Sequence, residues 1–286
     1  MEKYYQLESS ISGIEDIVRI CKETVEDAAN DGVVHVEPIL PNPWDYPAWN
    51  LGYDEFFDRI DDAFRKSSQQ YGVSVSYIVG VDRAMPTSVL EKVAQWAVDY
   101  QERGVEAFAY GGNEALGSQK VASACAIARK GGLQVIPHAG ESCGPPSIVE
   151  ALAITEASRL SHGIRAVESE ILMDVLAQNQ ICCDICPTSN VRMGVFGSFK
   201  EIPIKSFIQA GIPFTLNSDD SLFFGASIVD EYSNIQKEFN LDEAQIAKIA
   251  SDSIRFSYAS NIVKTKAIDD IAKWKEKALE GKGYLL

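Results

Sequence analysis

The stretch Leu133–Glu141, which reads Leu-Gln-Val-Ile-Pro-His-Ala-Gly-Glu, decides the expected fold. Its apolar run from Leu133 to Ile136 predicts a strand that Pro137 interrupts. His138 and Glu141 then follow in a turn that contains a glycine. In α/β proteins, chemistry is found at the carboxyl ends of strands, on the loops that precede the next helices. This turn is therefore the first candidate for a functional site.

Three later strand ends also carry polar residues. They are Ser161-His162-Gly163, Cys186-Pro187-Thr188-Ser189-Asn190 and Asn217-Ser218-Asp219-Asp220. The chain has three histidines. His138 lies in the first stretch, Leu133–Glu141, and His162 lies in one of the three later ones. Together the four stretches suggest a metal-assisted hydrolytic site.

The rest of the chain alternates strand and helix patterns. Strands are predicted at 33–39, 73–81, 105–110, 133–137, 159–161, 181–186 and 213–217. Helices are predicted at 13–30, 53–71, 87–103, 119–130, 147–157, 169–178, 204–210, 227–239 and 242–258, with a helical tail from 264. This alternation predicts parallel strands joined by crossover helices, and polar strand ends favour a TIM-type (β/α)8 barrel. We expect one domain, 1–286, with seven strands where a closed barrel needs eight, because no strand candidate precedes residue 13.

The charge balance excludes several classes of partner. A formal net charge of -15 argues against binding to nucleic acid or to an anionic membrane, which clustered Lys and Arg would favour. No apolar run approaches the roughly 18 residues of a spanning helix. The start, Met1-Glu2-Lys3-Tyr4-Tyr5, lacks the apolar core of an export signal, so we expect a cytoplasmic protein.

The six cysteines are interpreted as reduced, largely buried thiols. Cys183-x-x-Cys186 formally matches half of a zinc knuckle, but no second pair accompanies it. The two residues also lie in a strand-like run, where alternate side chains point to opposite faces. A metal role for this pair is therefore disfavoured.

Each candidate residue also has a purely structural interpretation. His138 is consistent with a core histidine that a backbone carbonyl satisfies, although Glu141 close by favours chemistry. Asp219 and Asp220 are consistent with an ordinary helix N-cap, or with one metal ligand and one substrate contact. Gly112 allows close approach of a ligand to the backbone, or simply forms a turn.

The motifs taken together resemble those of the adenosine deaminase family. His138-Ala139-Gly140-Glu141, Ser161-His162-Gly163-Ile164-Arg165, Cys186–Asn190 and Asn217–Asp220 occur in the family's order and approximate spacing. Weaker matches are Val33–Glu37, Val79–Arg83, Gly112-Asn113-Glu114 and Ser253–Phe256, so that the resemblance covers nearly the whole chain. The forms Cys-Pro-Thr-Ser-Asn and His-Gly-Ile-Arg-Ala resemble the adenosine-acting members more than the adenine-acting ones.

The resemblance implies hydrolytic deamination of adenosine, or 2′-deoxyadenosine, to inosine and ammonia with one Zn²⁺ per chain. It implies that His138 and Asp219 are zinc ligands, and that Glu141 protonates purine N1. It implies that His162 orients and stabilises the attacking hydroxide. It further implies that Asp220 hydrogen-bonds N7 and that the backbone of Gly112 contacts N3.

This sequence departs from the family pattern at the metal site. The family's first strand carries His-x-His, which supplies two more zinc ligands, and these 286 residues contain no such motif. The remaining histidine, His35, matches a second-strand position that is not a ligand. In addition, Pro38–Pro41 replaces a segment with a usual Arg, and Ser221 replaces a usual proline.

Three hypotheses follow from the missing motif. The first is an adenosine deaminase whose natural chain extends further at the amino terminus. The second is a non-catalytic relative that binds purine nucleosides, or a partner chain, without turnover. The third is a homo-oligomer or a complementing chain that supplies the missing strand and its histidines, because an open barrel would expose strand edges that favour association.

Overall fold

The computed structural model describes residues 10–41, 43–44, 46 and 49–280. The interpretation of Met1–Tyr5 concerns residues outside these ranges. The described chain forms two compact units: the first comprises Met1–Pro137 with Ala153–Glu156, and the second comprises His138–Leu152 with Ala157–Leu286. Strand β6, Gln134–Ala139, contributes residues to both units. The prediction of a single domain over 1–286 remains a prediction.

The strands of the main sheet are parallel, as predicted. Their hydrogen-bonded order is β2-β4-β5-β6-β7-β8-β9, which makes seven strands among the described residues. The bounds are Ile39–Leu40 (β2), Tyr77–Asp82 (β4), Val105–Gly111 (β5), Gln134–Ala139 (β6), Arg159–His162 (β7), Cys182–Ile185 (β8) and Phe214–Leu216 (β9). Each strand after β4 pairs with the strand that precedes it in the sequence, which is the order expected for crossover connections.

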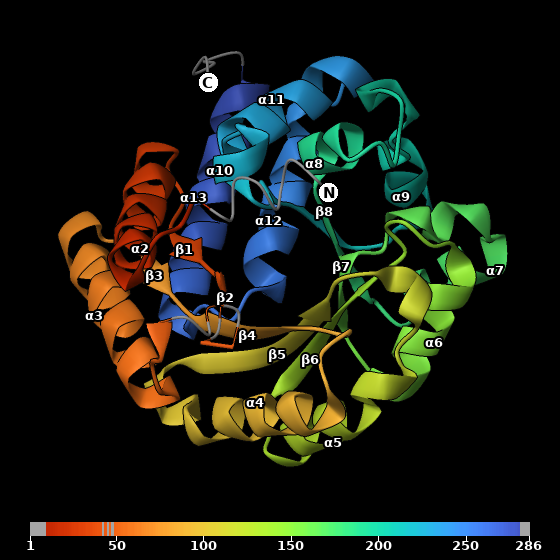
Figure 1. The fold of residues 1–286 in the computed structure, drawn as a ribbon. Coiled ribbons are helices and arrows are strands. Elements are labelled where there is room, and N and C mark those ends of the chain that lie inside the picture. Colours follow the sequence, from red (N-terminus) through yellow and green to blue (C-terminus); the bar gives the residue numbers. More distant parts are fainter. Residues whose placement is uncertain (1–9, 42, 45, 47–48, 281–286) are drawn as a thin grey trace. The chain divides into compact units, whose positions relative to one another are not determined.

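The first unit buries its sheet against amphipathic helices. Helices α2 (Ile14–Asn30) and α3 (Tyr53–Tyr71) pack together, and α4 (Thr87–Asp99) and α5 (Ala122–Lys130) lie beside β4, β5 and β6 (Figure 1). A cluster of aromatic side chains fills the space between α3 and α4. It includes Phe57, Tyr77, Trp96 and Tyr100.

Two predicted strands of this unit are each divided. The expected strand 33–39 becomes β1 (His35–Val36) and β2, and 73–81 becomes β3 (Ser74–Val75) and β4. The pair β1–β3 forms a separate two-stranded sheet. Pro38 stands at the break, where it has no N–H to donate to a ladder.

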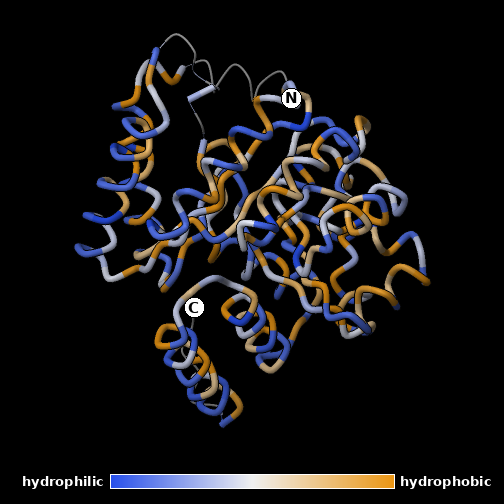
Figure 2. Tube along the Cα trace, turned by 90° about the horizontal axis from the view of Figure 1, so that it is seen from below, coloured by the Kyte–Doolittle hydropathy of each residue, from blue (hydrophilic) through white to orange (hydrophobic). Residues whose placement is uncertain are grey.

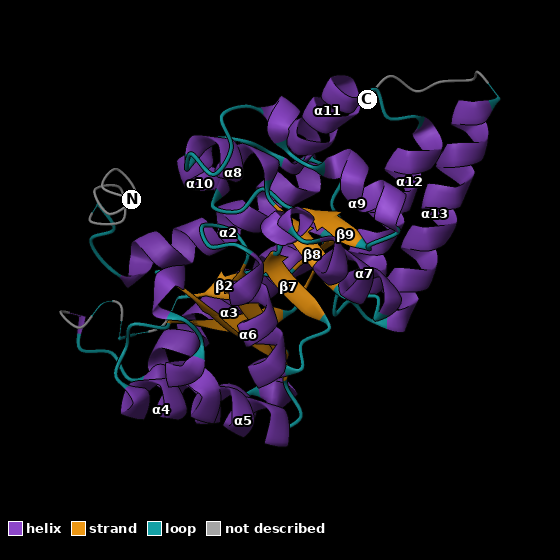
Figure 3. Ribbon diagram, turned by 90° about the vertical axis from the view of Figure 1, so that its right-hand side faces the viewer, coloured by secondary structure: helices purple, strands orange, loops and turns teal. Residues whose placement is uncertain are grey.

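The second unit surrounds β7, β8 and β9 with helices. They are α6 (Pro145–Thr155), whose last residues fall in the first unit, α7 (Glu170–Gln178), α8 (Pro187–Arg192), α9 (Ile204–Ala210), α10 (Ser221–Phe224), α11 (Ile228–Phe239), α12 (Glu243–Phe256) and α13 (Asn261–Leu279). Helices α12 and α13 lie side by side (Figure 3). Figure 2 shows hydrophilic and hydrophobic residues recurring along the helices, the pattern of helices that bury one face. The core of this unit includes Ile148, Leu160, Ile185 and Phe207, all fully buried.

Candidate active site

The turn after β6 places His138 and Glu141 at the carboxyl end of that strand. His138 is half-buried, and the Glu141 side chain is 25% exposed. Gly140 between them has φ +73°, and a Cβ added there would lie 2.3 Å from Ile148 Cδ1. Glycine is therefore needed at this position both for the backbone conformation and for packing against α6.

His162 ends the neighbouring strand β7 in a strained conformation. Its φ is +66°, in the left-handed region that a non-glycine residue rarely adopts, and it is 3% exposed. Its Nε2 lies 3.7 Å from Glu141 Oε2, and its ring centroid lies 5.3 Å from that of His138. Nδ1 of His162 is buried and has no hydrogen-bond partner. Strain and an unsatisfied buried atom in one residue point to a functional role.

The paired acids follow β9. Asp219 is exposed and also has a positive φ, +55°. One of its carboxylate oxygens accepts a hydrogen bond from the backbone N–H of Asp220 at 3.0 Å. Asp220 occupies the N-cap position of α10, but its side chain makes no capping hydrogen bond. The simple helix-cap interpretation of these acids is therefore not supported.

A potential metal-binding group forms where β7, β8 and β9 end. One ligand atom each from His162, Cys186 and Asp219 lie within 4.8 Å of one another. Cys186 immediately precedes α8, and its sulfur is buried. The sequence placed Cys186 at one of the polar strand ends and predicted a free, largely buried thiol; its proximity to His162 and Asp219 was not predicted.

The zinc-knuckle pattern itself does not form a site. Cys183 is fully buried and packs at Gly163, where an added Cβ would lie 2.7 Å from its sulfur. It is absent from the group that contains Cys186. Cys21, Cys125, Cys182, Cys183 and Cys186 are buried free thiols, as predicted, and Cys143 is half-buried.

Acidic groups dominate the electrostatics around Cys186. Burial raises the pKa of the Cys186 thiol well above its usual value, and the charges of Asp219, Asp184, Glu141 and Glu231 raise the pKa further. Such a concentration of negative charge attracts a divalent cation, which would reverse the local preference for the protonated thiol.

Glu231, on α11, is a buried carboxyl group that positions the first turn of α8. It is fully buried, and both of its carboxylate oxygens accept the backbone N–H of Thr188 at 3.2 Å. Burial raises the pKa of Glu231 to about 7. The carboxylate thus holds the first turn of α8, and with it the position of Cys186. No local sequence pattern pairs these two residues.

A buried polar chain connects β7, β8 and β9. Arg159 Nε donates to Asp184 at 2.7 Å, and Thr215 Oγ1 donates to the other Asp184 oxygen at 2.8 Å. Asn217 Nδ2 donates to Thr215 Oγ1 at 2.7 Å. Asn217 begins the loop that carries Asp219, so this chain of bonds fixes the start of that loop. The sequence showed only an isolated acid, Asp184, in an apolar run.

Two remaining candidates belong to the first unit. Gly112 follows β5 with φ +83°, and an added Cβ would lie 2.3 Å from Asp82 Oδ1. His35 has local partners for both ring nitrogens: Nδ1 bonds Ser74 Oγ at 2.8 Å, and Nε2 bonds Glu37 Oε1 at 3.2 Å. In the second unit His162 lies near Glu141, His138, Cys186 and Asp219, whereas His138 is not a member of the group that could hold a metal. Gly112 is positioned by its own strand end.

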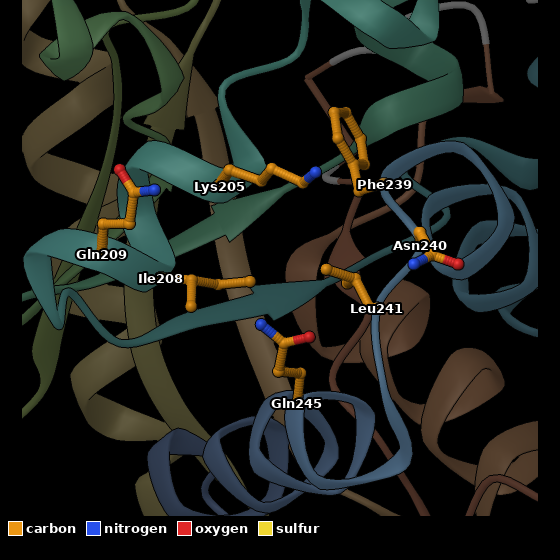
Figure 4. Close-up of a pocket in the computed structure, with 7 residues that line it drawn as sticks. All are labelled: Lys205, Ile208, Gln209, Phe239, Asn240, Leu241 and Gln245. Atoms are coloured by element: carbon orange, nitrogen blue, oxygen red, sulfur yellow. The ribbon is translucent and has the colours of Figure 1, made fainter.

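A surface pocket of the second unit lies on other elements. It has a volume of about 230 Å³ and is lined by residues of α9 and the α11–α12 junction, among them Lys205, Phe239 and Gln245 (Figure 4). None of the candidate site residues lines it. Across the described ranges, no helix combines the length and the apolar character that a membrane span requires.

Comparisons with known proteins identify the family. The family model described as adenosine deaminase matches residues 1–274. A putative adenosine/adenine deaminase of Streptomyces coelicolor is 33% identical over 272 residues, covering 95% of this chain and 79% of the relative. An aminodeoxyfutalosine deaminase of the same organism is 31% identical, with coverage of 95% and 70%.

Comparison of the fold with solved structures also finds a deaminase. The crystal structure of adenine deaminase from Arthrobacter aurescens matches with a TM-score of 0.89 and 25% identity, covering 96% of this chain and 84% of that one. The predicted TIM-type barrel class is thereby confirmed. The chain belongs to the adenosine deaminase family of metal-dependent aminohydrolases.

Proposed function

We propose that this protein deaminates adenosine and 2′-deoxyadenosine hydrolytically, giving inosine and ammonia. One observation carries the proposal: Glu141 and His162 lie 3.7 Å apart, beside a group of nitrogen, sulfur and oxygen donors. A carboxyl group and an imidazole at this separation can transfer a proton to one substrate atom and orient a water molecule toward the neighbouring atom. The small purine is the substrate class that the family membership supports.

The residues fit a zinc ion. Histidine nitrogen, cysteine sulfur and carboxylate oxygen are the donors that zinc prefers, and Nδ1 of His162 is buried without a partner. The resemblance assigns His138 and Asp219 to the metal. When bound, zinc would lower the pKa of a water molecule toward neutrality and so supply a nucleophile at physiological pH.

The protein's own groups then carry out the proton transfers. The oxygen of water adds to purine C6 while Glu141 delivers a proton to N1. One proton of the water restores Glu141, and the other passes to the exocyclic amino group, which leaves as ammonia when the C6–N bond breaks. His162 orients the attacking oxygen and stabilises its negative charge. Its buried, strained position leaves the imidazole little freedom to turn away.

Two further contacts would position the purine. Asp220 hydrogen-bonds N7, and because N7 is only an acceptor, this bond requires the protonated carboxyl group. The backbone N–H of Gly112 would donate to N3. The absence of a side chain at Gly112 leaves its backbone accessible to a flat ring.

The substrate itself is tested by a comparison of kcat/KM. The zinc-loaded protein should be assayed with adenosine, 2′-deoxyadenosine, adenine and aminodeoxyfutalosine. The last two are included because similar proteins are named as their deaminases. We expect adenosine and 2′-deoxyadenosine to be the best substrates, because the motifs that begin at His162 and Cys186 resemble those of the adenosine-acting members. A higher kcat/KM for adenine would reassign the protein to the base-acting members.

A further inference from the structure

Asp82 ends β4 on the face of the strand that points away from α4 and α5. Successive side chains of a strand point to opposite faces. Val79 and Val81 belong to the core cluster that includes side chains of α4 and α5, whereas Ile78 is buried outside that cluster. Asp82 shares the face of Ile78 and is exposed. Its carboxylate therefore stands at the carboxyl end of the strand, the edge that carries ligand sites in this fold.

The Asp82 carboxylate lies directly against Gly112. Strands β4 and β5 pair in parallel with Asp82 beside Gly111, so that Gly112 is the next residue at the neighbouring strand end. An added Cβ at Gly112 would lie 2.3 Å from Oδ1 and 2.8 Å from Oδ2 of Asp82. The space that a side chain at 112 would fill is thus taken by a carboxylate beside the Gly112 backbone.

Buried neighbours hold both residues in place. Arg83 is 1% exposed, and its Nε and its backbone N–H both donate to the Gly111 carbonyl oxygen, at 2.8 and 3.1 Å. The Arg83 guanidinium lies 5.1 Å from the centre of the Tyr110 ring. The Tyr110 hydroxyl in turn donates to the buried Ser118 Oγ at 2.8 Å. The pairing of carboxylate and glycine therefore depends on interior contacts.

The two carboxylate oxygens of Asp82 have different surroundings. Oδ1 accepts the backbone N–H of Ala84 at 2.7 Å, the turn bond that aspartate commonly makes to the residue two positions later. This is the hydrogen bond that the side chain makes within the described ranges, and Oδ2 makes none there. Asparagine would serve the turn equally well. The turn therefore does not explain why a carboxylate stands here.

We propose that Asp82 binds the ribose of the nucleoside by accepting a hydrogen bond from its 2′-hydroxyl. In a purine nucleoside, N3 and N9 are bonded to the same carbon, C4, and N9 carries the ribose. A carboxylate beside the backbone that contacts N3 is therefore within reach of the sugar. An ionised carboxylate only accepts hydrogen bonds, and acidic side chains bind the ribose 2′-hydroxyl in other nucleotide sites. The inference deepens the proposed function, from which it takes the contact between Gly112 and N3.

Calorimetric binding of the reaction products measures sugar recognition without turnover. The zinc-loaded protein should bind inosine about 10- to 100-fold more tightly than 2′-deoxyinosine, the effect of one hydrogen bond to a charged group. Asp82→Asn keeps the oxygen that the Ala84 N–H requires and replaces the other by an amide NH2, which cannot accept a hydrogen bond. This variant should weaken inosine binding by the same factor and leave the Kd of 2′-deoxyinosine unchanged.

Asp242→Asn is the matched control. Asp242 is an exposed residue of the second unit whose carboxylate accepts the backbone N–H of Gln245 at 2.8 Å, so that both Kd values should be unchanged. Equal affinities of the unsubstituted protein for inosine and 2′-deoxyinosine would overturn the assignment, even if Asp82→Asn fails to fold. So would a greater loss of affinity for adenine than for inosine in Asp82→Asn, because the carboxylate would then recognise the N9–H of the free base.

Turnover separates this inference from the proposed function. Deamination of adenosine by a protein that shows no preference for the 2′-hydroxyl would remove only the assignment of Asp82. A preference for inosine over 2′-deoxyinosine that Asp82→Asn abolishes, without deamination of any purine tested, would support the assignment of Asp82 and remove only the proposed activity.

Discussion

Two residues of the candidate site, His162 and Asp219, have positive backbone φ angles. Such conformations cost about 1–3 kcal/mol and persist where the surrounding structure imposes them. Here the surroundings constrain both residues: His162 ends the buried strand β7, and Asp219 follows the hydrogen-bonded chain from Asp184 through Thr215 to Asn217. The strained residues are thus held in place by neighbours with no direct chemical role.

Glu141 should be required for turnover but not for zinc binding. Glu141→Gln keeps the size of the side chain and removes its ability to exchange a proton. We expect kcat for adenosine to fall about 10²- to 10⁴-fold, the usual contribution of general acid–base catalysis. Zinc content by elemental analysis should be unchanged. Glu276→Gln on the exposed face of α13 is the control, and equal kcat values for the two variants would refute the assignment.

Glu231 should make stability depend on pH. Its pKa is raised from 4.5 to about 7 in the folded protein, so between these values the folded state binds a proton that the unfolded state has lost. Stability from this group therefore falls as pH rises from about 5 to 7, by roughly 3 kcal/mol in total.

Glu231→Gln should flatten this dependence and raise stability above pH 7. Urea unfolding at several pH values measures the effect. Parallel stability curves for the variant and the unsubstituted protein between pH 5 and 7 would show that Glu231 does not titrate in this range.

The sequence predicts which strand ends carry the candidate residues, but not the distances between their side chains. His138, Glu141, His162 and Asp219 each stand at the end of a predicted strand, and parallel strands bring such ends together. The proximity of Cys186 to His162 and Asp219 depends on distances between strand ends, which no spacing along the chain reveals. The same holds for Glu231, a buried carboxyl group whose partner lies on another helix.

At the scale of elements, the turn after β6 is the most constrained. Gly140 has a left-handed backbone and no room for a methyl group, since Ile148 Cδ1 and the Gly163 Cα are close. This turn sets the direction of both His138 and Glu141. The helix α8 is held in a comparable way by a distant residue, because Glu231 accepts the N–H of Thr188 in its first turn.

Gly140→Ala should destabilise the protein more than Gly211→Ala. Both glycines have φ near +70°, but an added Cβ at Gly211 has no neighbour within 4 Å. The conformational cost of about 1–2 kcal/mol is common to both, and the clash at Gly140 should add about 1–3 kcal/mol. Urea unfolding measures the difference. Equal losses of stability would show that α6 adjusts to the methyl group without cost.

The limits of element prediction have identifiable causes. Helices such as α2 and α3 match their predicted ranges, because their apolar periodicity is regular. The strand predicted at 33–39 is divided at Pro38, which cannot donate to a ladder. Helix α8 was missed because Pro, Thr, Ser and Asn are weak helix formers, and its stability depends on Glu231.

At the scale of the whole molecule, parallel α/β architecture and a seven-strand count follow from the alternation of patterns along the sequence. The division into two compact units does not, because β6 contributes residues to both and no change of composition marks the boundary. Of the predicted site residues, Gly112 belongs to the first unit, and His138, Glu141, His162, Asp219 and Asp220 belong to the second.

The net charge of -15 should exclude nucleic-acid substrates. Adenosine within a single-stranded oligonucleotide carries phosphates that an acidic protein repels. We therefore expect no conversion of adenosine to inosine in such an oligonucleotide under conditions where free adenosine is consumed. Mass spectrometry of the digested oligonucleotide checks this, and conversion at a comparable rate would refute the assignment to small-molecule substrates.

Ammonia released per adenosine consumed by the zinc-loaded, 286-residue protein is the most direct measurement. We predict one ammonia and one inosine for each adenosine, at a rate that Glu141→Gln lowers about 10²-fold or more. Calorimetric binding of adenosine to the zinc-loaded protein, with neither product formed, would contradict catalysis and identify the chain as a nucleoside-binding member of the family.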